Sequence, residues 1–370
     1  MRVPGNLWTK SSGSRQAMFF GGGGGGGGQW YRNLFGFTES TLEGTRREFT
    51  IEEAPGDTLL LRSKKNHKAY NVGNFSTPSL GELQARAGSL ARGRGLIRVT
   101  TAVNDVSVYH GLPENKHATF QVASQFNCLE FPSPRVTPEE GVTGYIGDRT
   151  QGPACSIACG PATVFRNNFV NMDDASTHLG SGGGQSRNRQ INNLLDVSTA
   201  LGNEPEGRFF EVRNGYVFAN GTGGLTALNE VLQQAAATAG EGGATTVAAV
   251  SEEDRLLSLL RVGVHRDVQV TSSRWGAVAQ EDEGHTVTQV FGSALSVAYD
   301  SFPTALWEPM ARLVLRASCK VTPTIYPTPE TDPNSTLAAL AQQTGRRSTP
   351  RRRRRRGTQK GRGAARTSCS

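Results

Sequence analysis

Residues 118–131 read ATFQVASQFNCLEF, and residues 146–169 read IGDRTQGPACSIACGPATVFRNNF. The first segment predicts a short apolar strand over residues 119–123 that runs directly into polar residues. The second predicts a helix over residues 154–165, because small residues dominate it and Pro153 suits the first helical position. A strand, a loop and a helix in this order are typical of α/β proteins.

Strand-like and helical segments alternate through the rest of the chain's middle part. The strand-like segments are residues 97–103, 119–123, 262–264 with 268–270, and 287–297. The helical segments are residues 154–165, 190–201, 225–237, 252–260 and 306–321. This alternation predicts an α/β domain with a mixed or parallel sheet flanked by helices.

A small antiparallel meander is expected upstream of this domain. Residues 48–52, 58–62 and 69–72 are short strand-like runs, and the segments between them, 55–57 and 64–67, have turn chemistry. Ser79, followed by Glu82 three residues later, forms a capping box that predicts the start of a helix.

The two ends of the chain have the composition of disordered segments. Residues 21–28 are eight consecutive glycines, and from about residue 327 Pro, Thr and Ser give way to an arginine run. The expected organisation is a disordered Gly-rich segment (1–28), a small β-rich extension (29–95), an α/β domain (96–325) and a disordered Arg-rich tail (326–370).

The positive charge of the chain is concentrated in its tail. The 370 residues contain 40 Lys and Arg against 32 Asp and Glu, but eleven of the 40 follow residue 345. The remainder, 29 against 32, excludes a strongly basic nucleic-acid-binding body. The hexamer Arg351 to Arg356 is dense enough to bind nucleic acid non-specifically, and is equally typical of a solvated tail or a nuclear-import signal.

The sequence predicts an intracellular protein, cytoplasmic or nuclear, that is neither secreted nor a membrane protein. No apolar run approaches the length that crosses a bilayer, and residues 1–20 lack the continuous apolar region of a secretory signal. Five scattered cysteines fit a reduced compartment better than a disulfide framework.

Candidate ligand-binding residues gather where the strand at 119–123 ends. Gln121 lies on the strand, and Ser124, Gln125 and Asn127 follow it, at the edge where open α/β sheets bind ligands. Thr150, Gln151 and Gly152 precede the predicted helix, whose exposed amides can hold a phosphate in the same crevice. Arg166 and Asn167, at the other end of that helix, complete this group.

A strand ending in an Asn-bearing loop, followed by a polar glycine-containing loop that opens a small-residue helix, resembles macro domains and poly(ADP-ribose) glycohydrolase-like proteins. Residues 287–299, VTQVFGSALSVAY, and the helical segment after them are similar to the family's late strand, phosphate loop and closing helix. The resemblance implies binding, and possible hydrolysis, of ADP-ribose or a related phosphorylated nucleoside, without a further cofactor.

The same resemblance assigns roles to single residues. It places Asn127 at the distal ribose, the segment from Ser293 to residue 296 around the diphosphate, and Phe291 or Tyr299 beside a ring. The chain departs from the family in having no glycine triplet after Asn127 and no glutamate pair beside Gln151.

Glycosidic cleavage requires a carboxyl group that protonates the leaving oxygen or a carboxylate that activates water. Glu130 and Asp148 are the two acids close enough in sequence for these roles.

Each of these features also has a purely structural interpretation. Gln125 and Asn127 can cap buried backbone groups of their loop, Asp148 and Arg149 can form a surface ion pair, and Arg166 and Asn167 suit a helix end. The alternative for the whole chain is therefore a non-catalytic interaction protein whose basic tail holds nucleic acid or an acidic partner.

Cysteines and glycine-rich loops give weaker indications. Cys155 and Cys159 lie four residues apart without a second Cys or His pair, which favours buried small side chains over a metal site. Nothing local activates Cys128 as a nucleophile. The glycine-rich segment 180–184, followed by Arg187 and Arg189, is a loop that can act as a lid over an anionic ligand.

Overall fold

The computed structural model describes residues 28–55, 58–89, 106–173, 183–221, 223–224, 226–227, 230–231, 252–278 and 285–292. The helices are α1 (Gln29–Phe35), α2 (Leu42–Arg47), α3 (Leu80–Ser89), α4 (Val106–Gly111), α5 (Gln151–Ala158), α6 (Gly160–Asn168), α7 (Leu195–Ala200) and α9 (Glu252–Leu259), with the short 3₁₀ turns η1 (Pro113–Asn115), η2 (Pro138–Glu140) and η3 (Thr143–Gly147). The strands are β1 (Phe49–Ala54), β2 (Thr58–Ser63), β3 (Ala69–Ser76), β4 (Thr119–Ala123), β5 (Phe210–Arg213), β6 (Tyr216–Ala219), β7 (Gly263–Gln269), β8 (Ser272–Arg274), β9 (Ala277–Val278) and β10 (Thr286–Gly292).

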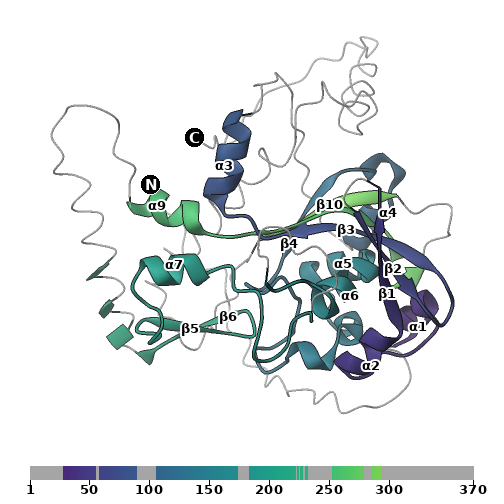
Figure 1. Cartoon of the computed structure of the whole chain (residues 1–370), viewed down its shortest axis with the longest axis horizontal. Coiled ribbons are helices and arrows are strands. Elements are labelled where there is room, and N and C mark those ends of the chain that lie inside the picture. The colour runs from purple at the N-terminus through teal and green to yellow at the C-terminus, as the bar shows by residue number, and fades with distance from the viewer. Residues whose placement is uncertain are drawn as a thin grey trace, which may run out of the picture.

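Six of these strands form one mixed sheet, in the order β1-β2-β3-β7-β10-β4 (Figure 1). Only β10 and β4 run parallel, while the other neighbouring strands are antiparallel. The α/β class with a mixed sheet flanked by helices, expected from the sequence, is thus confirmed. The parallel pair brings the carboxyl ends of β4 and β10 to the same edge of the sheet, the kind of edge at which open α/β sheets bind ligands.

The predicted meander is present as β1, β2 and β3, and it joins the rest of the sheet directly. Strand β3 pairs with β7 through Asn74↔Arg266, Phe75↔His265 and Ser76↔Val264. The predicted capping box also forms, since Ser79 N donates to Glu82 Oε2 at 2.7 Å and Glu82 N donates to Ser79 Oγ at 3.2 Å. The sheet therefore runs across the boundary expected at residue 95.

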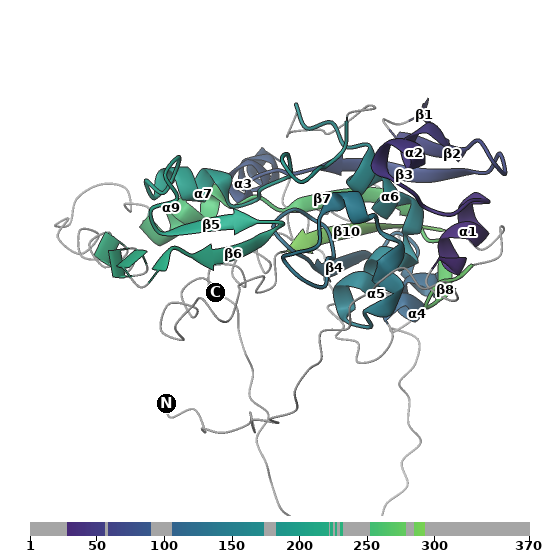
Figure 2. The same cartoon turned by 90° about the horizontal axis from the view of Figure 1, so that it is seen from below.

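Two large groups of buried side chains stabilise the molecule, beside a third group that consists of Cys159, Ala162, Val268, Val270 and Val287. The larger lies between the sheet and α1, α5 and α6, and α1 contributes Trp30, Tyr31, Leu34 and Phe35 to it. The smaller joins α3, α7, α9 and the β5–β6 hairpin, which gather at the other end of the molecule (Figures 1 and 2).

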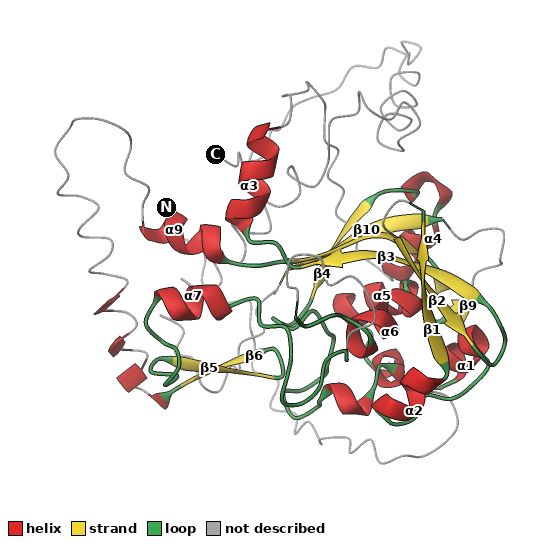
Figure 3. Cartoon of the chain, viewed as in Figure 1, coloured by secondary structure: helices red, strands yellow, loops and turns green. Residues whose placement is uncertain are grey.

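The loop after β4 connects these two groups. Phe126 packs in the smaller group, whereas Cys128, Leu129 and Phe131 pack in the larger one. In Figure 3 the green loops at the middle of the molecule lie between α5 and α6 on one side and α7 on the other. The loop is thereby fixed at both ends, and it carries the candidate site residues.

The single helix predicted over residues 154–165 is wrong, because the structure has two helices that meet at Cys159. Cys159 has φ −118° and ψ 56°, outside the helical region, and Pro161 follows two residues later. Proline has no N–H to donate to the preceding turn, so the second helix must begin anew there. Pro153 is the third residue of α5 rather than the first, still within the turn whose N–H groups have no helical partner.

Other predictions differ in extent. The helix expected over residues 190–201 is confined to α7, since Asn193 is tied into the backbone by Asn193 N donating to Phe126 O and Arg261 N donating to Asn193 O. The two runs 262–264 and 268–270 are a single strand, β7. The predicted strand 97–103, the helix 306–321, most of the helix 225–237 and both ends of the chain lie outside the described residues.

Within the described part of the chain, no helix combines the length and the apolar character that a bilayer crossing requires.

Candidate functional site

The candidate site begins at the carboxyl end of β4, where the chain meets the first turn of α5. Ala123 pairs with Gly292 of the parallel strand β10, and Ser124 N donates to Gly292 O at 3.3 Å. The N-cap residue of α5, Thr150, makes no side-chain capping bond, while its own N–H donates to Asp148 Oδ1 at 2.9 Å. The N-terminal turn of α5 therefore has its partial positive charge beside the strand end without a side-chain cap.

Gln151 holds α5 against β4. Its Oε1 accepts from Ala123 N at 2.6 Å and its Nε2 donates to Gln121 O at 2.5 Å. The side-chain amide thus pairs with β4 as a peptide group of a neighbouring strand would. Gln121 contributes its backbone carbonyl to this contact.

Ser124, Gln125 and Asn127 are occupied by hydrogen bonds within their own loop and its neighbours. Gln125 bridges Phe131, accepting from its N–H at 2.9 Å and donating to its carbonyl at 3.1 Å, and Ser124 Oγ donates to Gln125 O at 2.8 Å. Asn127 Oδ1 accepts from Leu129 N at 3.1 Å, and its Nδ2 donates to Gln190 Oε1 at 2.8 Å. These contacts fit the capping interpretation that the sequence left open.

Glu130 lies at the centre of the candidate site. Its side chain is buried, and its backbone N–H donates to Tyr145 Oη at 2.9 Å. Gly152, in the first turn of α5, lies so close that a Cβ on it would be 2.1 Å from Glu130 Oε2 and 2.1 Å from Ala123 O. Among the residues that the structure describes, none offers a hydrogen-bond donor to Glu130 Oε1.

The surroundings of Glu130 favour its neutral form. Burial raises the pKa of the Glu130 carboxyl well above its usual range, the nearby charge of Arg166 opposes this rise, and the charge of Asp148 adds to it. The protein thus holds a buried acid, with no hydrogen-bond partner for its Oε1 among the described residues, near a strand end and a helix N-terminus. A carboxyl group in such surroundings can donate a proton at neutral pH.

Arg166 lies behind this loop, in the core. Its Nε donates to Cys128 O at 3.3 Å, and its Nη2 donates to Ser156 Oγ at 3.2 Å and Thr163 Oγ1 at 3.0 Å. The guanidinium also lies 4.0 Å from the centre of the Phe291 ring. Arg166 is fully buried, so its charge acts on Glu130 through the protein rather than through solvent. Burial lowers the pKa of Arg166, and neighbouring groups oppose this shift.

Glu130 lies against Gly152 and close enough to Asp148 and Arg166 for their charges to act on it, whereas Asn167 makes its contact elsewhere. Asn167 Nδ2 donates to Pro138 O at 3.1 Å, a contact with η2. Ser293 lies outside the described residues. Tyr145, which binds the loop at Glu130, was missed because a lone tyrosine in a Gly-rich segment carries no recognisable signal.

The cysteines near the site are buried thiols. Burial raises the pKa of Cys128 to about 12, and burial also raises the pKa of Cys155 and of Cys159. A thiol with so high a pKa stays protonated and is a poor nucleophile. In the described part of the chain, no cluster of three or more His, Cys, Asp or Glu side chains is placed to hold a metal ion.

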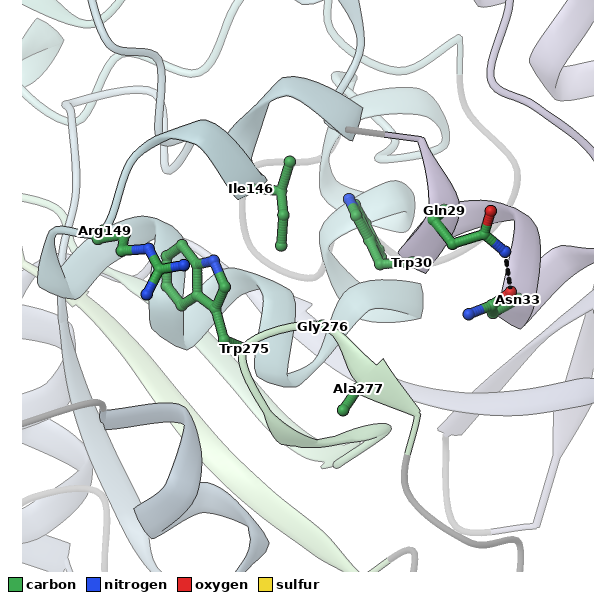
Figure 4. Close-up of a pocket in the computed structure, with 8 residues that line it drawn as sticks. All are labelled: Gln29, Trp30, Asn33, Ile146, Arg149, Trp275, Gly276 and Ala277. Carbon is green, nitrogen blue, oxygen red and sulfur yellow. Dashed lines mark hydrogen bonds between the residues drawn. The ribbon is translucent and has the colours of Figure 1, made fainter. Parts of the chain in front are cut away.

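A cavity of about 410 Å³ is lined by residues of α1, of η3 and the loop after it, and of the β8–β9 hairpin (Figure 4). Its lining consists of Gln29, Trp30, Asn33, Ile146, Arg149, Trp275, Gly276 and Ala277. None of the predicted ligand-binding residues belongs to this lining. The two tryptophans escaped notice in the sequence because they lie 245 positions apart and in segments with no other functional signal.

Searches of protein-family models, of curated proteins and of solved structures find no match for this chain. The assignment of a function therefore rests on the geometry of the chain itself.

Proposed function

We propose that the chain binds ADP-ribose or a related phosphorylated nucleoside at the N-terminal turn of α5, and that Glu130 serves as the general acid in cleaving its glycosidic bond. The observation that carries the proposal is the buried carboxyl group of Glu130 beside Gly152, whose Oε1 has no hydrogen-bond partner among the described residues. An unpaired buried acid costs folding free energy, and such groups are concentrated at functional sites.

The phosphates of the ligand are assigned to α5. This helix has eight residues, its N-cap Thr150 makes no side-chain capping bond, and Thr150 and Gln151 are exposed. Backbone N–H groups at a helix N-terminus bind phosphate through hydrogen bonds and the helix dipole together. The resemblance of residues 118–169 to macro domains supports the same class of ligand.

The chemistry requires two carboxyl groups with different protonation. Glu130, kept neutral by burial, donates its proton to the leaving oxygen as the bond to the anomeric carbon breaks. Asp148, half-buried on the loop before α5, accepts a proton from the attacking water. Arg166 favours the carboxylate that Glu130 becomes after it has given up its proton.

Binding is tested by calorimetric titration of ADP-ribose into the full chain. Thr150→Asp places a negative charge and a stronger cap at the first turn of α5, so we expect an intact helix and at least about tenfold weaker binding. Gln84→Glu adds the same charge on the exposed surface of α3 and should leave the affinity unchanged. Equal affinities in all three proteins would refute the α5 site.

Hydrolysis is tested by the release of ADP-ribose from an ADP-ribosylated peptide. Glu130→Gln should lower the rate about 10²-fold or more while binding persists, since removal of a general acid has effects of this size. Glu114→Gln, an exposed acid of η1, is the control. If the wild type binds ADP-ribose but does not hydrolyse the peptide linkage, the chain is a binding protein and not a hydrolase. If Glu130→Gln keeps the wild-type rate, Glu130 is not the general acid.

A non-catalytic interaction protein is the second candidate. It is favoured by the hydrogen bonds that occupy Ser124, Gln125 and Asn127 within the loop. A wild-type chain that binds no phosphorylated nucleoside would favour this candidate.

A further inference from the structure

The cavity in Figure 4 is built from three separate parts of the chain. Helix α1 contributes Trp30, the η3–α5 connection contributes Ile146 and Arg149, and the β8–β9 hairpin contributes Trp275. Tyr145, which precedes Ile146, binds the backbone of Glu130 instead. The segment 145–149 therefore separates this cavity from the candidate site at Glu130, and the two sites can be tested independently.

Aromatic and cationic groups line the cavity. The guanidinium of Arg149 lies 5.2 Å from the ring centre of Trp275, and Figure 4 shows this pair at one end of the cavity. Trp30 is fixed by its Nε1, which donates to Thr143 O at 3.2 Å. At the opposite end, Gln29 Nε2 donates to Asn33 Oδ1 at 2.5 Å.

The backbone at Trp275 is strained, and its ring also packs against the main core. Arg274 pairs with Ala277, so Trp275 and Gly276 form a two-residue turn, with φ of 30° and 78°. Such turns favour Asn-Gly, because bulky residues are strained at positive φ.

The β5–β6 hairpin provides a comparison within the same chain. It has Asn214 and Gly215 at the equivalent positions, with φ of 47° and 77°. Strain of this kind at a bulky residue is typical of functional positions.

The strained turn is held in place by neighbouring hydroxyl groups. Trp275 N donates to Ser107 Oγ at 2.8 Å, and Gly276 N donates to Ser272 Oγ at 2.9 Å. Ser107 belongs to α4, so the hairpin is anchored to a helix rather than moving alone. The backbone that carries the indole is thus held by two hydrogen bonds.

The single positive charge of the lining indicates a ligand with an acidic group. Arg149 is the one charged side chain among the lining residues, and the others are amides, aliphatic groups and indoles. Indole and guanidinium faces stack with planar rings, and a guanidinium binds carboxylate or phosphate through paired hydrogen bonds.

We infer that this cavity binds a small planar aromatic anion, with its ring stacked at Trp275 and its acidic group at Arg149. A nucleoside monophosphate and an aromatic carboxylate share this chemistry. The volume of about 410 Å³ suits a ligand of either size.

The test is calorimetric titration of the full chain with AMP, 2-naphthoate, adenosine and inorganic phosphate. We expect AMP, 2-naphthoate or both to bind, adenosine to bind about tenfold more weakly than AMP, and phosphate not to bind. Binding of AMP alone would identify the source as a nucleotide, and binding of 2-naphthoate alone as an aromatic acid. No binding of either, or phosphate binding as tightly as AMP, would overturn the inference.

Two variants locate the site. Trp275→Asn removes the ring while keeping a residue that accepts positive φ, so the hairpin should fold, and the affinity should fall about tenfold or more. Arg149→Gln should have a similar effect, and Arg135→Gln, an exposed arginine in the loop after β4, should have none. Unchanged affinity in both cavity variants would place the ligand elsewhere.

This inference stands apart from the proposed function. Trp275→Asn should weaken the binding of 2-naphthoate or AMP at the cavity about tenfold or more and leave ADP-ribose binding at α5 intact, whereas Thr150→Asp should weaken ADP-ribose binding and leave 2-naphthoate binding intact. If either variant loses the binding of both the cavity ligand and ADP-ribose, the two ligands share one site.

Discussion

The carboxyl group of Glu130 is buried, and its Oε1 has no hydrogen-bond partner among the described residues. These two properties determine how Glu130 affects the stability of the protein as the pH changes. Burial raises the pKa of its carboxyl, although the charge of Arg166 limits the rise. Above the ordinary glutamate pKa of about 4.3, the unfolded chain loses this proton while the folded chain keeps it. The contribution of Glu130 to the free energy of unfolding therefore falls as the pH rises toward its raised pKa.

Glu130→Gln should remove this dependence, since glutamine is neutral at every pH. We expect the variant to gain stability relative to the wild type between pH 5 and pH 8, as measured by urea unfolding at both values. Glu114→Gln, at an exposed position, is the control. A stability difference between variant and wild type that stays constant from pH 5 to pH 8 would mean that Glu130 is already ionised in the folded protein at pH 5.

Glu39 shows that burial alone does not identify a functional acid. Burial raises its pKa, but its Oε2 accepts from Val142 N at 2.9 Å, from Thr143 N at 2.7 Å and from Thr143 Oγ1 at 2.5 Å. These bonds hold the start of η3 in place, which is a structural role. Glu130 lacks any comparable set of donors among the described residues.

At the scale of elements, the contact between α5 and β4 depends on a glycine. Gly152→Ala would place a methyl group 2.1 Å from Ala123 O and Glu130 Oε2, so helix and strand must separate. We expect a loss of about 1–3 kcal/mol in the free energy of unfolding, the usual range for overpacking.

Gly144→Ala in η3 is the matched control for Gly152→Ala. No atom lies within 4 Å of the position its methyl group would take, so the change should stay within about 0.5 kcal/mol. Urea unfolding of both variants gives the comparison. Equal effects would show that α5 does not approach β4 as closely as the structure has it.

The sequence predicted some elements well because their signals are local. Strand β4 has the predicted bounds, and the Ser79 capping box forms with both of its hydrogen bonds. The β5–β6 hairpin was missed although Asn214-Gly215 between two short strand-like runs is a clear turn signal. The break between α5 and α6 was missed because the run of small residues outweighed Pro161 in the interpretation.

The candidate site was predictable only in part. The sequence predicted Glu130 as a candidate acid, because it follows the strand at residues 119–123 closely. Whether an amide faces a ligand or its own loop depends on contacts with distant residues, as Asn127 shows with Gln190 and Gln125 with Tyr216. Such contacts carry no local signal.

At the scale of the whole molecule, the first described helix and the meander belong to the main core. The Phe35 ring lies 5.0 Å from that of Phe49 and 5.6 Å from that of Tyr70, and β3 pairs with β7. A chain that begins at residue 96 loses these aromatic groups and exposes one side of β7. We expect it to show no cooperative thermal unfolding, whereas a chain that begins at residue 28 should unfold cooperatively. A cooperative transition in the shorter chain would show that residues 96–370 fold alone.

The central claim is that a phosphorylated nucleoside binds at the first turn of α5. Its most direct test is the thermal unfolding of the full chain and of Thr150→Asp, each with and without ADP-ribose. For the wild type, ligand at a hundred times its Kd should add about 2.7 kcal/mol of stability and raise the Tm. Thr150→Asp should have an equal or higher Tm without ligand, owing to its better cap, and a much smaller shift with it. A wild-type Tm that does not move at millimolar ADP-ribose would contradict the account.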